Sequence, residues 1–222
     1  MFVPRQYREP DGSWMTDLIH DNPLALAVTN GGDDGPFATH LPIIPDPHTV
    51  IDWSDSPNGA ILLGHLNRAN PHWRALRTGE AILLVFTGPH GYVSPAVYEM
   101  TPASPTWNFT SVHVHGVIEK VDSIEETLDV VRATALAFET RFGFGWDQSE
   151  SVDYFRSIVS GVGAFRVTVT SAEGMFKLSQ EQPPEIRERV KKSFSQRACS
   201  RHQATAEFME RLPQNGLRAT ER

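Results

Sequence analysis

The chain has 222 residues, of which 40% are hydrophobic, and its formal net charge is −7. This length and apolar content suffice for one domain with a buried core, alone or with a helical appendage. The acidic balance lacks the electropositive footprint of a nucleic-acid binder, and no apolar stretch reaches the length of a membrane span. We therefore expect neither nucleic acid nor a membrane as a partner.

A single cysteine, Cys199, cannot form an internal disulfide, and it lies in a polar segment of helical character. The chain also opens without the basic and apolar regions of a secretory signal. These features argue against a catalytic thiol and predict a protein of the reducing cytoplasm.

The first half of the chain is strand-like. Four short segments carry the apolar patterns of strands: 24–29, 36–42, 60–65 and 81–86. The first two flank the turn-rich sequence NGGDDG and predict a hairpin. Between the last two, Asn70 caps and Pro71 opens a short helix.

The next strand, residues 111–121, alternates strictly, so that His113 and His115 share one face. The second half of the chain is more helical. A capping box at Ser123 starts an amphipathic helix that ends at Gly143 and covers the barrel, with an apolar stripe through Ile124, Leu128, Val131, Ala135, Phe138 and Phe142. A shorter helix near 152–159, a strand at 164–170 and a charged helix from Pro183 follow.

Short strands joined by Gly and Pro turns, with a few helices, predict an α+β, mainly β fold. A small barrel with helical decoration fits this pattern, and a sandwich is the alternative. We expect the cofactor-binding barrel domain within residues 1–180 and a C-terminal helical extension in residues 181–222. Small barrels of this kind often pair, so a homodimer is expected.

Histidines gather in and beside the predicted strands. Six of the nine lie there: His40, His65, His72, His90, His113 and His115. No HExxH occurs, and the lone cysteine excludes a CxxC zinc site. The two histidines of the alternating strand share a face and could chelate a metal, although hydrogen bonds to their neighbours are the commoner arrangement.

His65 differs from the others because it ends an apolar strand and follows Gly64, which would leave the backbone beside it open to a flat cofactor. An imidazole on a rigid strand end suits axial ligation of haem iron. Arg68 and the helix N-terminus that Asn70 caps suit a phosphate or a propionate. The alternative is that His65 only bonds a carbonyl in the following turn.

A second group of polar side chains follows the strand at 81–86. Gly88 to Gly91 predict a tight turn at the barrel rim that carries His90, with Tyr92 next to it. A structural role for this turn is the alternative. Trp107, just before the histidine strand, packs either against a ring system or as a plug in the barrel end.

Several common catalytic motifs are absent from the sequence. It contains no GxSxG, no GxGxxG and no P-loop, and it offers no Cys–His pair worth pursuing. Hydride chemistry on a Rossmann domain is therefore excluded.

Six motifs then occur in one order along the chain: MFVP at the start, ATHLP (38–42), GHLNRANPHWR (64–74), FTGPHGYVSP (86–95), PTWNFTSVHVHG (105–116) and FKLSQ (176–180). In this order and spacing they resemble the PaiB family of FMN-binding negative transcriptional regulators, over nearly the whole chain. The resemblance implies a split β-barrel of the flavin-reductase and pyridoxamine-phosphate-oxidase type. It also implies a homodimer with the cofactor between the subunits.

Within that family, the chain departs from the regulator-like members. Those tend to read NPQW, GPHAYIS and TWNY, where this chain reads NPHW (70–73), GPHGYVS (88–94) and TWNF (106–109), with a second histidine in VHVHG. In these departures it resembles the haem-dependent piperazate synthases. The axial ligand of the haem b in that branch corresponds by motif to His65.

Piperazate synthases convert N5-hydroxy-L-ornithine into L-piperazic acid by forming an N–N bond with loss of water. The cofactor-binding residues expected on this resemblance are His65, Arg68, Asn70 and Trp107, with His65 as the iron ligand. The candidates for proton handling are His90, Tyr92 and His115, and Arg68 is also a candidate for holding the substrate carboxylate.

Two other functions stay open at this point. The first is an FMN-binding regulator of the PaiB type, although the acidic charge and the lack of a helix-turn-helix signature argue against direct DNA contact. The second is a flavin-dependent oxidoreductase, because one scaffold hosts several chemistries. The identity of the cofactor, haem or FMN, would separate them.

Overall fold

The computed structural model describes residues 1–31, 35–49 and 57–213. The strands of this part are β1 (Leu24–Thr29), β2 (Phe37–Pro45), β3 (Ile61–Asn67), β4 (Ala81–Val93), β5 (Thr106–Lys120) and β6 (Val162–Lys177). Its α-helices are α1 (Ser13–Asp21), α2 (Pro71–Ala75), α3 (Ile124–Phe142), α4 (Val152–Ile158), α5 (Pro184–Ser195) and α6 (Ser200–Glu210). Short 3-10 turns include η1 (Arg5–Tyr7), η3 (Pro95–Val97), η4 (Ser149–Ser151) and η5 (Val159–Gly161).

The strands close into a barrel in the order β1-β2-β3-β6-β5-β4, with antiparallel neighbours throughout. The predicted hairpin is confirmed, since β1 and β2 pair with Leu26 opposite His40. The mainly β barrel class is therefore confirmed, and the sandwich alternative is wrong because the sheet closes on itself.

Strand β4 departs from the sequence prediction. Instead of turning at Gly88–Gly91, it continues to Val93, and its register against β5 shifts between Thr87 and His90. A β-bulge of this kind accommodates a proline, which has no N–H to donate to the hydrogen-bond ladder between the strands. Gly88 is needed there because a Cβ would lie 2.3 Å from Thr110 Oγ1. The Gly-Pro pair marks a bulge in a long strand.

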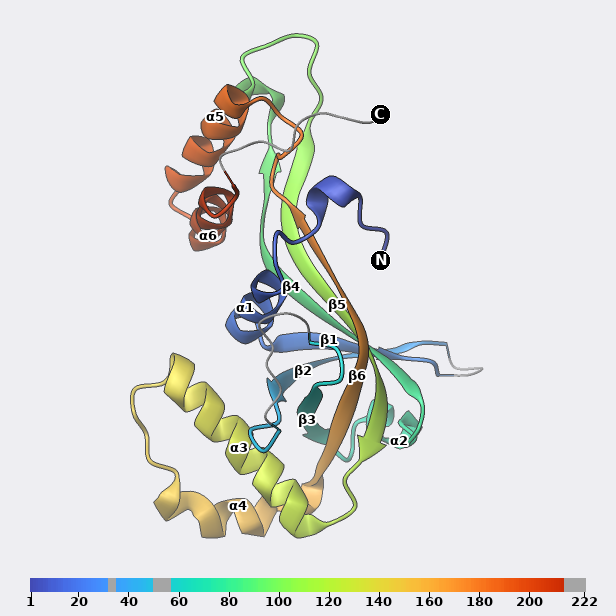
Figure 1. Cartoon of the computed structure of the whole chain (residues 1–222). Helices are drawn as coiled ribbons and strands as arrows, with labels where there is room; N and C mark the ends of the chain where they lie inside the picture. Colours follow the sequence, from blue (N-terminus) through green and yellow to red (C-terminus); the bar gives the residue numbers. More distant parts are fainter. Residues whose placement is uncertain (32–34, 50–56, 214–222) are drawn as a thin grey trace.

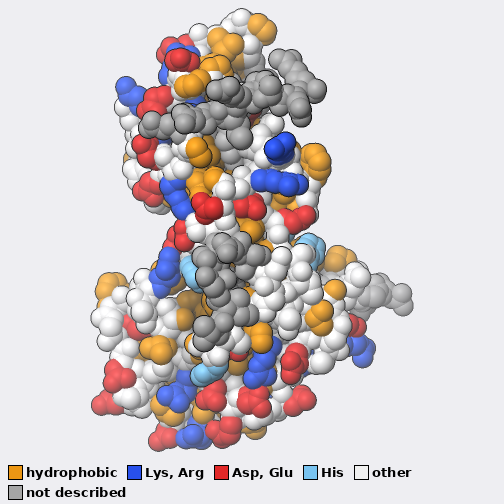
Figure 2. Space-filling model, viewed as in Figure 1, with side chains coloured by type: hydrophobic (Ala, Val, Ile, Leu, Met, Phe, Trp, Pro, Cys, Tyr) orange, Lys and Arg blue, Asp and Glu red, His pale blue; other side chains and the backbone are white. Residues whose placement is uncertain are grey.

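The long strands β4, β5 and β6 rise beyond the barrel (Figure 1). We call residues 88–93, 106–111 and 175–177 the arm. The inner face of the arm is covered by α1, α5 and α6, whose buried side chains join the main core cluster: Leu18, Val190, Phe194, Phe208 and Met209 among them. Figure 2 accordingly shows an elongated molecule with a narrower middle. The arm is thus a packed extension of the barrel core.

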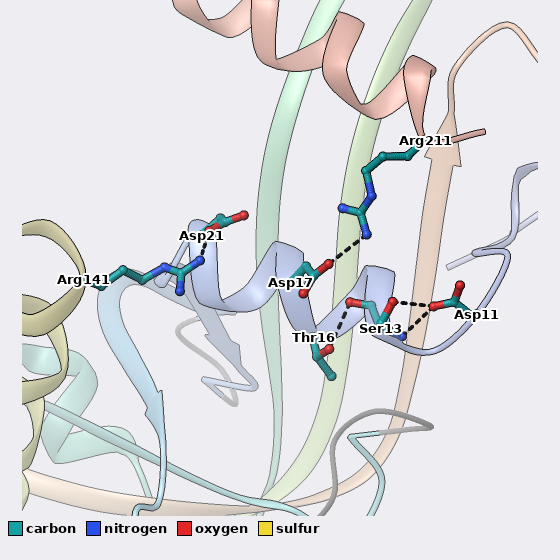
Figure 3. A network of polar contacts seen from close by, with 7 residues as sticks. All are labelled: Asp11, Ser13, Thr16, Asp17, Asp21, Arg141 and Arg211. Atoms are coloured by element: carbon teal, nitrogen blue, oxygen red, sulfur yellow. Dashed lines mark hydrogen bonds and ion pairs between the residues drawn. The ribbon is translucent and has the colours of Figure 1, made fainter. Parts of the chain in front are cut away.

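Helix α1 lies between α3 and the C-terminal helix α6, and ion pairs join it to α3 and to the residue that follows α6 (Figure 3). Asp21 at its end pairs with Arg141 of α3, and Asp17 accepts a 2.8 Å bond from Arg211 after α6. Exposed pairs of this kind each contribute about 0–1 kcal/mol to stability. They fix how the helices are oriented, while apolar burial holds them on the sheet.

Helix α3 begins and ends as predicted, with Ser123 accepting a bond from the Glu126 amide and Gly143 at the C-terminal end. Its buried residues are Thr127, Leu128, Val130 and Thr134, of which only Leu128 belongs to the predicted apolar stripe. The predicted apolar stripe included Ile124 and Phe142, which are exposed. Threonine can be buried here because the hydroxyls of Thr127 and Thr134 donate 2.8 Å bonds to carbonyls four residues earlier.

The C-terminal helices pack on the arm. Helix α5 follows Pro183 as expected, and it buries Ile186, Val190 and Phe194. Helix α6 follows Cys199, and its Met209 sulfur accepts a hydrogen bond from Asn108 of β5. Within the described ranges, no helix has the length and apolarity needed to cross a membrane.

Candidate functional site

His65 lies on β3, opposite Ala164 of β6, with its side chain on the outer face of the barrel. It is half-buried, and its Nδ1 is buried without a hydrogen-bond partner among the described residues. Burial lowers the pKa of this imidazole below its ordinary value. His65 is therefore neutral near pH 7, which is the form that binds a metal.

The space beside Gly64 does not serve a cofactor, contrary to the sequence prediction. Gly64 faces the barrel interior, where a Cβ would lie 2.4 Å from Phe165 Cζ and 2.7 Å from Ile43 Cδ1. The glycine is required by core packing. Because side chains alternate along a strand, a group bound to His65 approaches from the opposite, outer face.

Arg68 and Asn70 lie close to His65, at the end of β3 and the start of α2. The Asn70 side chain accepts a 2.9 Å bond from the His72 amide, which confirms the predicted helix cap. Arg68 Nε donates a 2.7 Å bond to the Val162 carbonyl, and its guanidinium lies 5.6 Å from the Trp73 ring centroid. Both residues fix this end of the barrel, and their contacts to a cofactor stay a prediction.

His90, Tyr92 and Trp107 form a second group on the arm. Trp107 Nε1 donates a 3.2 Å hydrogen bond to His90 Nδ1, and the Tyr92 and Trp107 ring centroids are 6.0 Å apart. Tyr92 is 43% exposed and Trp107 46% exposed, so the interpretation of Trp107 as a plug of the barrel end is wrong. Burial, helped by the charge of Arg201, lowers the pKa of His90.

His115 and His113 share the outer face of β5, as predicted from their spacing. His115 is exposed and lies between Leu83 and Ser171 of the neighbouring strands. His113 is half-buried opposite Glu173. The described part of the chain contains no cluster of three or more His, Cys, Asp or Glu side chains able to hold a metal ion.

The two groups of predicted site residues lie at opposite ends of the sheet. His65 pairs with Ala164, whereas Phe109, the partner of His90, pairs with Lys177 of the same strand. At about 3.3 Å per residue, these positions are separated by roughly 40 Å measured along β6. Within one chain, the structure therefore does not bring His65 together with His90, Tyr92 and Trp107.

Sequence reasoning missed a cavity of about 770 Å³ between α3, the end of α1 and β2. Its walls include Ile19, Ile44, Arg132 and Phe138, and none of the predicted site residues lines it. No local signal marks such a cavity, because its walls come from three separate elements, and Ile19 of α1 lies more than 100 residues from Phe138 of α3.

Comparison with known proteins agrees with this architecture. Protease synthase and sporulation protein PAI 2 of Bacillus subtilis is 27% identical over 186 residues, which cover 82% of this chain and 83% of the relative. The FAD and heme binding protein of Mycobacterium smegmatis is 16% identical with a TM-score of 0.51, covering 77% of this chain and 73% of that one.

The flavocytochrome Anf3 of Azotobacter vinelandii is 15% identical with a TM-score of 0.51, and the match covers 78% of this chain and 72% of that one. At these identities, the two solved structures show a shared fold. The family described as "Putative FMN-binding domain" matches residues 1–171. The chain therefore belongs to the PaiB family of FMN-binding domains.

Proposed function

We propose that the chain binds haem b through His65 and cyclises N5-hydroxy-L-ornithine to L-piperazic acid. The observation that carries the proposal is the neutral, half-buried imidazole of His65, whose buried Nδ1 has no partner among the described residues. The motif resemblance to piperazate synthases supports it. Two proteins of the same fold, one named for FAD and heme and one a flavocytochrome, are consistent with it.

The residues at His65 fit a haem better than a bare metal ion. A haem iron takes four ligands from its macrocycle and needs one axial imidazole from the protein. His65 offers one neutral imidazole on a rigid strand. When bound, the haem would supply a Lewis acid that weakens the N–O bond of the hydroxylamine.

The proposed reaction balances without an added oxidant or reductant. The α-amine lone pair forms the N–N bond, the N–O bond breaks, and the hydroxyl leaves as water with a proton that the amine gives up. Folding the ornithine chain so that its nitrogens meet is the larger contribution of the protein, because the attack is intramolecular. Arg68, three residues after His65 in the chain, is our candidate for holding the substrate carboxylate.

The contact between Trp107 and His90 restricts what His90 can do. Because Nδ1 of neutral His90 accepts the bond from Trp107 Nε1, its proton lies on Nε2. In this tautomer His90 presents an N–H donor, which suits orientation of the substrate or of the departing hydroxyl. Tyr92 and His115 are then the remaining candidates for handling the proton that the amine gives up.

We propose further that two copies of the chain build each site. The outer sheet face carries exposed apolar side chains, Leu24, Tyr92, Trp107 and Val117, which is typical of an interaction surface. A two-fold dimer through this face would run the arm of one copy towards the His65 end of the other. This arrangement joins the two groups that a single chain keeps apart.

The haem proposal is tested by expressing the protein with iron and a haem precursor and recording spectra before and after dithionite reduction. We expect a Soret band that shifts on reduction, and normally ligated haem should be lost in His65→Ala. His115→Phe is the matched control and should keep its haem. Undiminished, normally ligated haem in His65→Ala would overturn the proposal, and a flavin spectrum without a Soret band would favour the FMN-binding alternatives.

The shared site is tested with mixed dimers of His65→Ala and His90→Ala chains that carry different tags. If each site takes His65 from one copy and His90 from the other, each mixed dimer has one intact site and about half of the wild-type activity. The homodimers of either variant should be inactive. Alanine replaces His90 because it removes the Nε2 donor, whereas glutamine would supply another N–H donor. Inactive mixed dimers, or a monomeric mass in sedimentation, would contradict the arrangement.

A further inference from the structure

The cavity between α3, α1 and β2 is separate from the residues proposed for haem and substrate. Its volume of about 770 Å³ lies within the range of small-molecule sites, which is about 300–1,000 Å³. Helix α3 forms one wall, Ile19 and His20 at the end of α1 a second, and Ile43 and Ile44 of β2 a third.

The cavity is lined mainly by hydrocarbon. Its apolar lining residues include Ile19, Ile44, Leu136, Ala137 and Phe138. A pocket of this size with such walls favours the body of an apolar molecule, since transferring apolar surface out of water stabilises a complex by about 25 cal/mol per Å². The polar groups then decide which end group the molecule carries.

Basic side chains predominate among these polar groups. His20, His48, Arg132 and Arg141 line the cavity, and Asp129 is the acidic residue among the described lining residues. Arg141 is paired with Asp21 of α1 (Figure 3). Burial and the charge of Arg141 lower the pKa of His20, against the influence of Asp17 and Asp21. Arg132 is therefore the permanently charged lining residue that is not joined to a carboxylate by an ion pair among the described residues.

The side chain of Arg132 is incompletely satisfied. Its Nε is buried without a hydrogen-bond partner, and no ion pair joins it to a carboxylate among the described residues. The neighbouring Gln148 donates a 3.3 Å bond to the Arg132 carbonyl, while its own buried Oε1 has no partner in the described ranges. A buried donor without an acceptor costs about 1–3 kcal/mol, and more when it is charged.

We propose that this cavity binds a monocarboxylate with an apolar body, whose carboxylate meets the Arg132 guanidinium. A charge-assisted bond to a carboxylate supplies the acceptor that the described residues do not. The apolar walls do not suit N5-hydroxy-ornithine, whose short methylene chain carries polar groups at both ends. The site is thus a second one, and it does not depend on haem binding at His65.

The test uses isothermal titration calorimetry of the full chain with decanoate at pH 7.5. Decylammonium serves as the probe of equal length and opposite charge. We expect one decanoate per chain, with binding at least about tenfold weaker for decylammonium, for Arg132→Met and for the cavity-filling variant Leu136→Trp. Arg156→Met, which removes an exposed guanidinium of α4 outside the cavity, should bind decanoate as the parent does.

Three results would overturn the inference: no decanoate binding by the parent chain, equal affinity for decylammonium, or unchanged decanoate affinity in Arg132→Met. Melting temperatures check that each variant folds, and Arg132→Gln is the substitute if Arg132→Met does not. His65→Ala should bind decanoate normally, and Arg132→Met should keep its haem. Failure of the haem proposal and failure of this one are therefore distinguishable.

Discussion

His72 and His65 differ in what their ring nitrogens contact. His72 is 1% exposed, with Nε2 bonded to Thr29 at 2.9 Å and Nδ1 to Thr39 at 2.8 Å. Both nitrogens are satisfied, so His72 holds the β1–β2 hairpin against α2. His65 keeps a buried nitrogen without a partner among the described residues, which a structural role does not explain.

Gly64 gives a prediction at the same scale. In Gly64→Ala the new methyl would meet Phe165 Cζ at 2.4 Å and Ile43 Cδ1 at 2.7 Å inside the barrel. Overpacking of this kind costs about 1–3 kcal/mol, so the free energy of unfolding measured in urea should fall by that amount.

The matched control for this prediction is Gly161→Ala. A Cβ at Gly161 meets nothing within 4 Å, and the free energy of unfolding should change by less than about 0.5 kcal/mol. Equal losses in the two variants would contradict the packing argument for Gly64.

At the scale of elements, the apolar segments in the sequence mark the middles of the strands and miss their ends. The run at 81–86 belongs to a strand that extends to Val93, and the run at 164–170 to one that covers Val162–Lys177. The missed parts form the arm, where glycine, proline and polar residues interrupt the apolar pattern. Their burial comes from α1, α5 and α6, which a local pattern does not include.

The contact between the arm and α6 can be tested at Gly91. A Cβ there would lie 2.6 Å from His202 Cδ2 and 3.0 Å from Phe194 Cζ. Gly91→Ala should therefore displace α6 and raise deuterium uptake in Ser200–Glu210, while β1 to β3 keep their protection. Unchanged uptake in α6 would contradict the close contact.

Adding His202→Ala to Gly91→Ala removes the ring that the new methyl meets. The double variant should recover part of the protection of α6, because the two changes act on one contact and are not additive. Equal or greater uptake in the double variant would show that His202 is not the group that the methyl displaces.

For the whole molecule, the order of six motifs was sufficient to predict the barrel class and the family. The arrangement of the site residues was not predictable in the same way. His65 lies on β3 and His90 on β4, two strands of the same sheet. Only the pairing of β3 and β5 with different parts of β6 shows that these histidines lie at opposite ends of that sheet. The cavity next to Arg132 escaped prediction because α1, β2 and α3 form it together.

The buried and half-buried histidines give a prediction for the pH dependence of the whole fold. Burial is the largest cause of a lowered pKa at six of them: His20, His65, His72, His90, His113 and His202. Below the ordinary histidine pKa of 6.5, the unfolded chain takes up protons that the folded chain does not. The contribution of these neutral histidines to the free energy of unfolding should therefore be retained well above pH 6.5, and the free energy of unfolding should fall as the pH drops below that value.

Carboxyl groups change the free energy of unfolding in a more acidic pH range than the histidines. The pKa values of Glu139 and Glu173 are lowered from 4.5, chiefly by hydrogen bonds, so their contribution to stability is lost only at more acidic pH.

The free energy of unfolding measured in urea at pH 7.5, 6.5 and 5.5 consequently reflects the titration of the histidines. His72→Gln, which cannot take up a proton, should show a smaller loss between pH 6.5 and 5.5 than the parent. A stability that is constant or rises on acidification over this range would mean that the folded chain protonates these imidazoles as readily as the unfolded one.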